Sequence, residues 1–188
     1  MTDPAMSDPA TSDPAMSDPA MSDPAMTDPD MTDPATELRI RPMTPADIDR
    51  VLQLALSLPQ VPHWPPTAYT SALQPGAIPR RIALVAEDPN TGAVAGFAVA
   101  GLLPPQAELE SIAVAGGCQR RGLGRRLFTA LAPELRSAQA EEVVLEVRAS
   151  NHAALAFYRS LGFLQTGTRS RYYVDPVEDA VLMAVPLK

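Results

Sequence analysis

The chain has 188 residues, a net charge of −7 and a single cysteine, Cys118. One cysteine excludes an intrachain disulfide, and two well-separated histidines, His63 and His152, do not complete a ligand set for a metal. No apolar run is long enough to cross a bilayer or to form the core of a signal peptide. We therefore expect a soluble, cytoplasmic protein that holds no metal.

The first 35 residues are seven variants of a five-residue unit such as Met-Thr-Asp-Pro-Ala. They contain eight aspartates, seven prolines and no lysine or arginine. A proline in every unit prevents a helix, and Ala and Met leave little apolar surface to bury. The composition predicts a disordered acidic tail over residues 1–36. It is either an interaction tail, a tandem expansion without function, or an overlong translation start with Met31 as the alternative.

The net negative charge belongs to this tail. Removing its eight aspartates from the 22 acidic residues leaves 14, against 15 basic residues, so the remainder is close to neutral at +1. About 150 residues suit one domain with one hydrophobic core. We predict a single folded domain over residues 37–188.

Alternation of apolar and polar side chains predicts strands in this domain, and apolar residues spaced by three or four predict helices. In chain order, we expect a strand at 37–43, a helix from 44 to 58, an irregular proline-rich segment at 59–80 with a short helix near 66–73, strands at 81–87, 93–103 and 108–114, a helix at 123–138, a strand at 143–148, a helix at 151–161, and strands at 163–173 and 180–187.

Local signals support several of these boundaries. Thr44 can cap the first helix, because Pro45 suits the first helical position and Asp47 suits the first turn. Pro133 breaks the rule for the helix at 123–138 and costs about 3 kcal/mol unless the helix kinks there. The order of elements puts helices on both faces of a mixed sheet, in an α/β arrangement.

A glycine-rich turn precedes the helix at 123–138. Its sequence, Gln-Arg-Arg-Gly-Leu-Gly-Arg, occupies residues 119–125. The first N–H groups of a helix lack partners and lie at the positive end of its dipole, and glycine lets a ligand approach the backbone closely. The turn therefore predicts a site for a phosphate or pyrophosphate. Its arginines could also bind nucleic acid, but a near-neutral domain without neighbouring aromatic residues favours a diphosphate.

The strand at 143–148 contains an unusual carboxylate. Alternate residues on one face are all apolar, and Glu146 and Arg148 share the other face. A strand this apolar is usually central in its sheet, so Glu146 should be at least partly buried, which is costly for a carboxylate that is neither paired nor used. Two interpretations stay open: a structural ion pair, with Arg148 or another residue, or a role in catalysis.

The next helix begins after Asn151, a good N-cap, and carries Tyr158 on its apolar stripe. The spacing alone favours a core aromatic residue for Tyr158. A buried phenol still needs a hydrogen-bond partner, and Tyr158 lies only one strand–helix unit from Glu146.

Five segments together resemble the GNAT N-acetyltransferases, and within them the RimI-type ribosomal-protein alanine N-acetyltransferases. The turn at 119–125 fits the signature Q/R-x-x-G-x-G/A. LEVRASN at 145–151 and FYRSLGF at 157–163 resemble the RimI type, as do RYY at 171–173 and EDAVLMA at 178–184.

The similarity is dense from about residue 108 to 187 and looser over 37–107, where the element order and Pro62-His63-Trp64 are similar. It does not cover the five-residue repeats. It implies the GNAT fold, a mostly antiparallel central sheet with helices on both faces, in which strands four and five splay apart and acetyl-CoA lies in the gap.

The resemblance also implies roles for particular residues. Glu146 would be the general base and Tyr158 the general acid. Asn151 would contact the cofactor. The backbone of strand four would pair with the pantetheine arm of acetyl-CoA through Ile112, Ala113 and Val114, and the turn would hold the pyrophosphate through Arg120, Arg121, Gly122, Leu123, Gly124 and Arg125.

Glu108 is a rival for the general base, because GNAT histone acetyltransferases carry their catalytic glutamate at the corresponding position of strand four. We favour Glu146, since Glu108 follows two prolines near the start of its strand, where a solvated carboxylate costs little. Glu110 and Cys118 depart from the family pattern: the first is usually apolar or aromatic and the second often aromatic.

These roles imply transfer of acetyl from acetyl-CoA to a protein amine, and we expect the N-terminal alanine of a ribosomal protein, with no membrane or direct nucleic-acid partner. One alternative is a GNAT enzyme acting on a small-molecule amine or a lysine side chain. Another is a non-catalytic acetyl-CoA-binding regulatory module, against which the presence of both Glu146 and Tyr158 argues.

Overall fold

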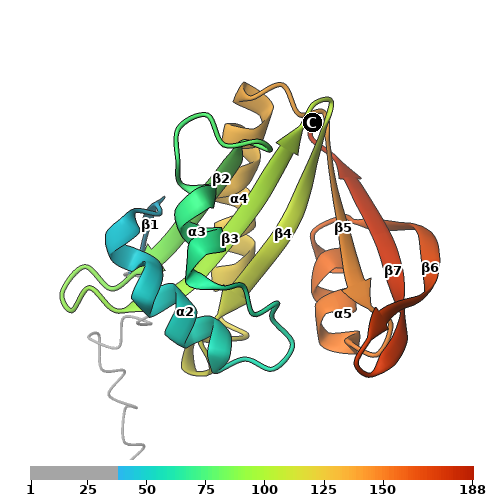
Figure 1. The fold of residues 1–188 in the computed structure, drawn as a ribbon, viewed down its shortest axis with the longest axis horizontal. Helices are drawn as coiled ribbons and strands as arrows, with labels where there is room; N and C mark the ends of the chain where they lie inside the picture. Colours follow the sequence, from blue (N-terminus) through green and yellow to red (C-terminus); the bar gives the residue numbers. More distant parts are fainter. Residues whose placement is uncertain (1–37) are drawn as a thin grey trace, which may run out of the picture. The chain divides into compact units, whose positions relative to one another are not determined.

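The computed structural model describes residues 38–188, so the predicted acidic tail lies outside the described residues. Strands and helices alternate in the expected order (Figure 1). The strands are β1 (Arg39–Pro42), β2 (Arg81–Glu87), β3 (Val94–Leu103), β4 (Gln106–Val114), β5 (Glu142–Arg148), β6 (Leu164–Val174) and β7 (Val177–Pro186); the helices are α2 (Ile48–Leu56), α3 (Pro66–Ala72), α4 (Leu123–Ser137) and α5 (His152–Ser160), with short 3-10 turns η1 (Pro45–Asp47) and η2 (Gly116–Cys118).

The strands form one sheet in the order β1-β2-β3-β4-β5-β7-β6. Every neighbouring pair is antiparallel except β4 and β5, which are parallel. These two strands pair only where residues 106–108 lie against residues 142–144. Beyond that point they diverge, leaving the opening visible between them in Figure 1. The predicted splay of the fourth and fifth strands is confirmed.

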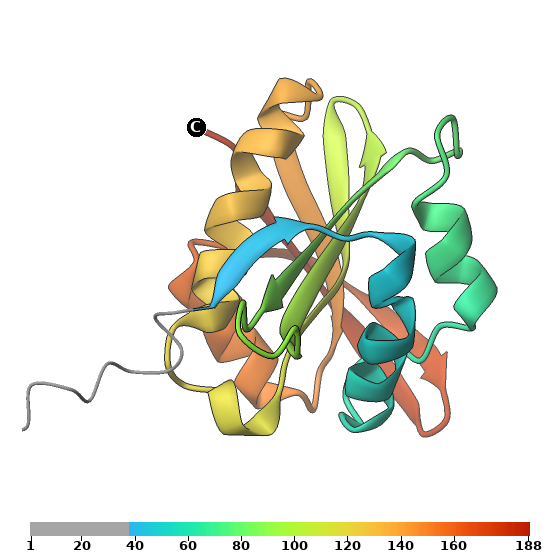
Figure 2. The ribbon, with the colours of Figure 1, turned by 90° about the vertical axis from the view of Figure 1, so that its left-hand side faces the viewer.

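The helices cover both faces of the sheet, as the element order predicted. Helices α4 and α5 pack on one face and α2 and α3 on the other, with the sheet between them (Figure 2). The leucines spaced by four along α4 are all fully buried, because they lie on the side of the helix that faces β2, β3 and β4. In this part of the chain no helix is long and apolar enough to cross a membrane.

Two strands begin earlier than expected, and the expected helix at 123–138 is not interrupted at Pro133. Strands β4 and β7 begin at Gln106 and Val177, earlier than predicted, because the turns before them are limited to Pro104-Pro105 and Asp175-Pro176. Helix α4 continues through Pro133. Pro133 and Thr129, whose carbonyl loses its helical partner, are both exposed, so water can satisfy that carbonyl.

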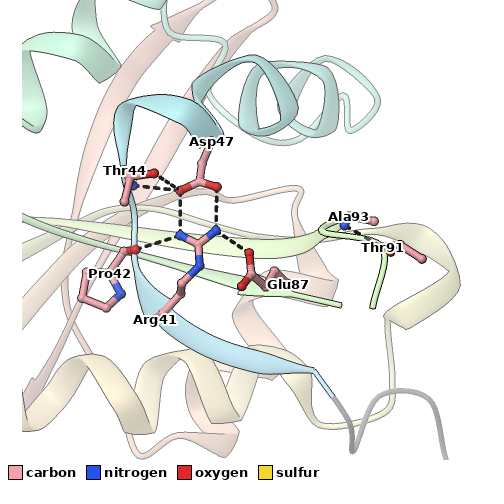
Figure 3. Close-up of polar contacts among 7 residues, drawn as sticks. All are labelled: Arg41, Pro42, Thr44, Asp47, Glu87, Thr91 and Ala93. Carbon is pink, nitrogen blue, oxygen red and sulfur yellow. Dashed lines mark hydrogen bonds and ion pairs between the residues drawn. The ribbon is translucent and has the colours of Figure 1, made fainter. Parts of the chain in front are cut away.

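A partly buried ionic network fixes the start of α2 on the sheet (Figure 3). Arg41 donates to both carboxylate oxygens of Asp47, at 2.7 and 2.8 Å, and also pairs with Glu87. Asp47 further accepts the backbone N–H of Thr44 at 2.8 Å, which completes the predicted cap. The hydrogen bonds from Arg41 hold the pKa of the buried Asp47 carboxyl far below its usual range. Nearby, Thr91 accepts the N–H of Ala93 within the β2–β3 turn.

Candidate active site

A cleft of about 660 Å³ occupies the gap between β4 and β5. Its walls come from β4, from the end of β5, from the first turns of α5 and from the segment between α2 and α3. The structure therefore brings together both predicted proton-transfer residues and four of the predicted cofactor-binding residues. They are Glu146, Tyr158, Ile112, Ala113, Val114 and Asn151.

The backbone of β4 is open toward the cleft. Strand β3 pairs with one edge of β4 along its whole length, whereas β5 pairs with the other edge only as far as Glu108. Peptide groups past that residue can therefore hydrogen-bond an extended ligand in the cleft, as an added strand would.

The glycine-rich turn lies directly before α4. Gly122 adopts a left-handed conformation (φ 80°) at the N-cap, where no side chain caps the helix. The first backbone bond of the helix runs from the N–H of Arg126 to the carbonyl of Gly122, so the N–H groups of residues 123–125 precede it. A Cβ added at Gly122 would meet nothing within 4 Å. The turn thus presents unpaired N–H groups and open space, which suits a diphosphate.

The remaining residues of this turn have distinct structural roles. Gly124 allows α4 and α5 to approach each other, because a Cβ there would lie 3.1 Å from the ring of Phe157. Arg125 donates to the carbonyl of Ser160 at 2.9 Å and Arg126 to that of Leu38 at 2.6 Å. Of the residues in the turn, Gln119 lines the cleft, and its side chain donates to the carbonyl of Val114. Arg125 of the turn and Arg126, directly after it, therefore hold neighbouring segments together.

Glu146 is partly buried, as the pattern of β5 predicted, and its side chain is 20% exposed. It forms an ion pair with Arg169 of β6 at 2.7 Å and accepts a hydrogen bond from the Tyr172 hydroxyl. That hydrogen bond raises the pKa of Tyr172. Two partners therefore fix the carboxylate at the edge of the cleft.

Of the ion pairs left open for Glu146, the structure contains one with another residue, Arg169, and not the one with Arg148. Arg148 instead pairs with Glu178 at 3.2 Å and lies 4.1 Å from the centre of the Tyr173 ring. The cause is the β6–β7 hairpin, whose turn returns to the end of β5 and offers Arg148 both a carboxylate and backbone carbonyls.

A wide bulge in β6 brings Tyr172 to Glu146. Three residues, 170–172, stand opposite the single residue Asp179 of β7. The Asp179 carboxylate accepts the N–H of Arg171 at 2.7 Å, and Arg171 has a left-handed backbone (φ 53°). Sequence reasoning missed the contacts of Arg169 and Tyr172 with Glu146. The only signal was that Tyr172 belongs to the RYY segment of the resemblance.

Tyr158 belongs both to the core and to the cleft. Its ring packs against Phe157 and Phe163, at 5.4 and 5.6 Å between ring centres, while it also lines the cleft. Burial raises the pKa of Tyr158 to about 12. The phenol is therefore protonated throughout the neutral range. Asn151 caps α5, accepting the N–H of Ala154 at 3.1 Å.

Glu108, the rival carboxylate, is near enough to Glu146 for their negative charges to interact. Burial raises the pKa of Glu108, and the negative charges of Glu110 and Glu146 raise it further. Glu110 is paired with Arg81 through two hydrogen bonds, at 2.7 and 2.9 Å. Across residues 38–188, no group of three or more His, Cys, Asp or Glu side chains is arranged to hold a metal ion.

Comparison with known protein families identifies the family of this chain. Residues 49–163 match the model of the acetyltransferase (GNAT) family. The chain belongs to the GNAT acetyltransferases and is an acetyl-CoA-dependent N-acetyltransferase.

Its relatives narrow the class further. A [ribosomal protein bS18]-alanine N-acetyltransferase of Escherichia coli (strain K12) is 45% identical over 100 residues, covering 52% of this chain and 68% of the relative. The N-alpha-acetyltransferase RimI of Mycobacterium tuberculosis is 39% identical over 144 residues, covering 75% and 87%. The crystal structure of the ribosomal-protein-S18-alanine N-acetyltransferase from E. coli superposes with a TM-score of 0.68 at 32% identity, covering 80% of this chain and 94% of that one. The chain is thus closely related to the RimI-type enzymes.

Proposed function

We propose that this enzyme acetylates the N-terminal alanine of ribosomal protein bS18. The observation that carries the proposal is the pair of proton-transfer groups, Glu146 and Tyr158, on the walls of one cleft in a chain similar to bS18-alanine N-acetyltransferases. A ribosomal acceptor implies reaction in the cytoplasm, with a protein N-terminus as the partner.

An α-amine is the easier acceptor for such a site. Its pKa is about 8, against about 10.4 for a lysine side chain, so presenting a neutral lysine at pH 7 costs about 3 kcal/mol more. At pH 7 about a tenth of α-amines are already neutral, so a carboxylate base has less work to do on an α-amine than on a lysine. The chemistry therefore favours an N-terminal amine over a lysine side chain.

We assign acetyl-CoA to the cleft. Bound there, it supplies a thioester already activated for acyl transfer. The open edge of β4 at Ile112, Ala113 and Val114 would bind its extended arm, and Asn151 would border it. The N–H groups at the start of α4 would bind the pyrophosphate, through the turn from Arg120 to Arg125.

In this assignment Glu146 takes the proton of the acceptor amine, directly or through a water. Arg169 and Tyr172 restrict its carboxylate to one orientation, which favours a productive approach of the amine. The carboxylate needs no rearrangement before it accepts the proton.

Tyr158 donates a proton to the leaving sulfur. Proton transfer from a phenol with a pKa of about 12 to a free thiolate is unfavourable in free energy, since thiols have pKa values near 8.5. Proton transfer must therefore be coupled to breaking of the carbon–sulfur bond. Burial keeps the phenol protonated until that step.

A direct assay tests the function. Purified enzyme is given acetyl-CoA and three peptides: one starting with the bS18 N-terminal alanine, the same peptide with a blocked α-amine, and one with a free lysine but a blocked N-terminus. We expect acetylation of the first peptide only, located on the α-amine by mass spectrometry. Acetylation of the lysine peptide at an equal rate would contradict the proposal.

A further inference from the structure

Glu110 occupies a special position on the wall of the cleft. In the β3–β4 ladder Val99 faces Ser111 and Ala100 faces Leu109, so Glu110 is the extra residue of a bulge. A bulge redirects the side chain of its extra residue. Here it points a carboxylate into the lining of the cleft, where the side chain is only 12% exposed.

Arg81 holds this carboxylate through both of its oxygens. Its Nε donates to Oε2 at 2.7 Å and its Nη2 to Oε1 at 2.9 Å. Gly101 leaves room for the pair, because a Cβ at that position would lie 3.0 Å from Oε1 of Glu110. A two-point pair of this kind fixes orientation as well as charge.

The same arginine contacts Trp64, next to the opposite wall of the cleft. Its guanidinium lies 6.0 Å from the centre of the Trp64 ring, which packs 5.3 Å from the fully buried Tyr69. Trp64 directly follows residues 58–63, which line the cleft across from β4. The Arg81–Glu110 pair therefore connects the β4 wall of the cleft with Trp64, the residue that directly follows the opposite wall.

Glu108 and the four charged side chains that act on it together carry one negative charge. The charges that act on Glu108 are those of Glu110, Glu146, Arg81 and Arg169. Arg81 compensates Glu110 and Arg169 compensates Glu146, so three carboxylates face two guanidinium groups. Among residues 38–188, Glu108 forms no ion pair. One uncompensated charge matches one ammonium group.

We propose that the Arg81–Glu110 pair determines acceptor specificity, because it keeps this cluster at one uncompensated negative charge. The site then accepts the α-amine of a peptide whose first residue has a neutral side chain. The inference rests on the proposed acetylation of a protein N-terminus. It assigns Arg81 and Glu110 to selection of the first residue, and neither is needed for proton transfer. Breaking the pair should therefore alter the choice of acceptor.

The test compares two peptides that differ only in the first residue, norleucine or Nε-trimethyl-lysine. The second keeps a positive charge and cannot be acetylated on its side chain. The quantity measured is the ratio of kcat/KM for the charged over the neutral peptide. Arg81→Met leaves Glu110 unpaired, and we expect this ratio to rise by about fivefold to tenfold. Glu110→Gln leaves Arg81 unpaired, so the ratio should fall.

Two further variants separate charge from packing. Arg81→Lys keeps the charge, and the double variant Arg81→Met/Glu110→Gln removes both charges, so each should return the ratio to within about twofold of the wild type. Arg50→Met, on the exposed side of α2 beside the β2–β3 turn, changes the net charge equally and should leave the ratio unchanged. Equal ratios in every variant would overturn the inference, whatever their thermal stabilities.

Binding distinguishes this inference from the proposed function. Peptide Kd values for the CoA-loaded variants, measured by calorimetry, give the same charged-to-neutral ratio without turnover. A wild type that acetylates no N-terminal peptide would refute the proposed function. The Kd ratio should rise in Arg81→Met, fall in Glu110→Gln and stay near the wild-type value in Arg81→Lys and in the double variant. Kd ratios that do not follow this pattern would refute the specificity role alone.

Discussion

The carboxylate of Glu146 on β5 and the guanidinium of Arg169 on β6 form an ion pair of 2.7 Å at the edge of the cleft. Strand β7 lies between these two strands in the sheet, so the pair spans it. The Tyr172 hydroxyl adds a second contact from the same bulged part of β6. Orientation of the proposed base thus depends on the last hairpin of the chain.

Removing Arg169 should therefore slow the reaction through Glu146. We expect Arg169→Ala to lower kcat by about tenfold, because a base that samples several orientations is less often aligned with the amine. Arg169→Lys should recover most of the loss, while KM for acetyl-CoA stays near the wild-type value in both. An unchanged kcat in the alanine variant would show that Glu146 does not need this partner.

The glycine-rich turn should bind CoA through its backbone. In Gly122→Val, a side chain would fill the open space before α4, and we expect CoA binding to be lost in calorimetry. Gly76→Val is the matched control, because Gly76 has the same φ of 80° and equally open surroundings but lies far along the chain from the turn. It shares the backbone strain and should retain binding.

Arginine charge in this turn should contribute less. Arg121→Ala is expected to weaken CoA binding only modestly, since the N–H groups at the start of α4 remain in place. If Gly122→Val and Arg121→Ala lose binding equally, the backbone does not dominate recognition of the diphosphate.

The Arg41–Asp47 pair should make the unfolding free energy depend on pH. Its hydrogen bonds lower the pKa of Asp47 in the folded state, so the stabilisation is present above the unfolded carboxyl pKa of about 3.9 and is lost as the pH falls below it. Asp47→Asn should lower the unfolding free energy at pH 7 by about 2 kcal/mol, because the guanidinium of Arg41 then faces a neutral amide in place of a carboxylate.

Urea denaturation from pH 7 to pH 3 checks this prediction. The difference between wild type and Asp47→Asn should shrink toward the acid end of the range. Asp49→Asn, on the exposed side of α2, should differ little from wild type at any pH. A difference between wild type and Asp47→Asn that is constant with pH would indicate that the carboxylate charge contributes nothing.

Local patterns predicted much of the fold. The alternation in β5 placed Glu146 opposite the apolar face, and the leucines of α4 predicted both the helix and its buried side, because these signals involve neighbours in sequence. The extent of the opening between β4 and β5 came from the family resemblance, since no local pattern reports where two strands stop pairing.

Contacts between distant residues could not be predicted in the same way. Arg169 meets Glu146 only because β7 lies between their strands and a bulge shifts the register of β6. The pairing of Glu110 with Arg81 depends likewise on a bulge in β4. The prediction of a disordered acidic tail over residues 1–36 rests on composition alone and stays a prediction, because these residues lie outside the described part of the chain.

The choice between Glu146 and Glu108 as general base is the central claim about the site. The pH–rate profile of kcat/KM on an N-terminal alanine peptide tests it most directly, for wild type, Glu146→Gln and Glu108→Gln. We expect Glu146→Gln to lose about 10²–10⁴-fold at neutral pH, with recovery at high pH where the amine deprotonates unaided, and Glu108→Gln to lose less than about tenfold. An acidic limb that survives in Glu146→Gln and vanishes in Glu108→Gln would contradict the assignment.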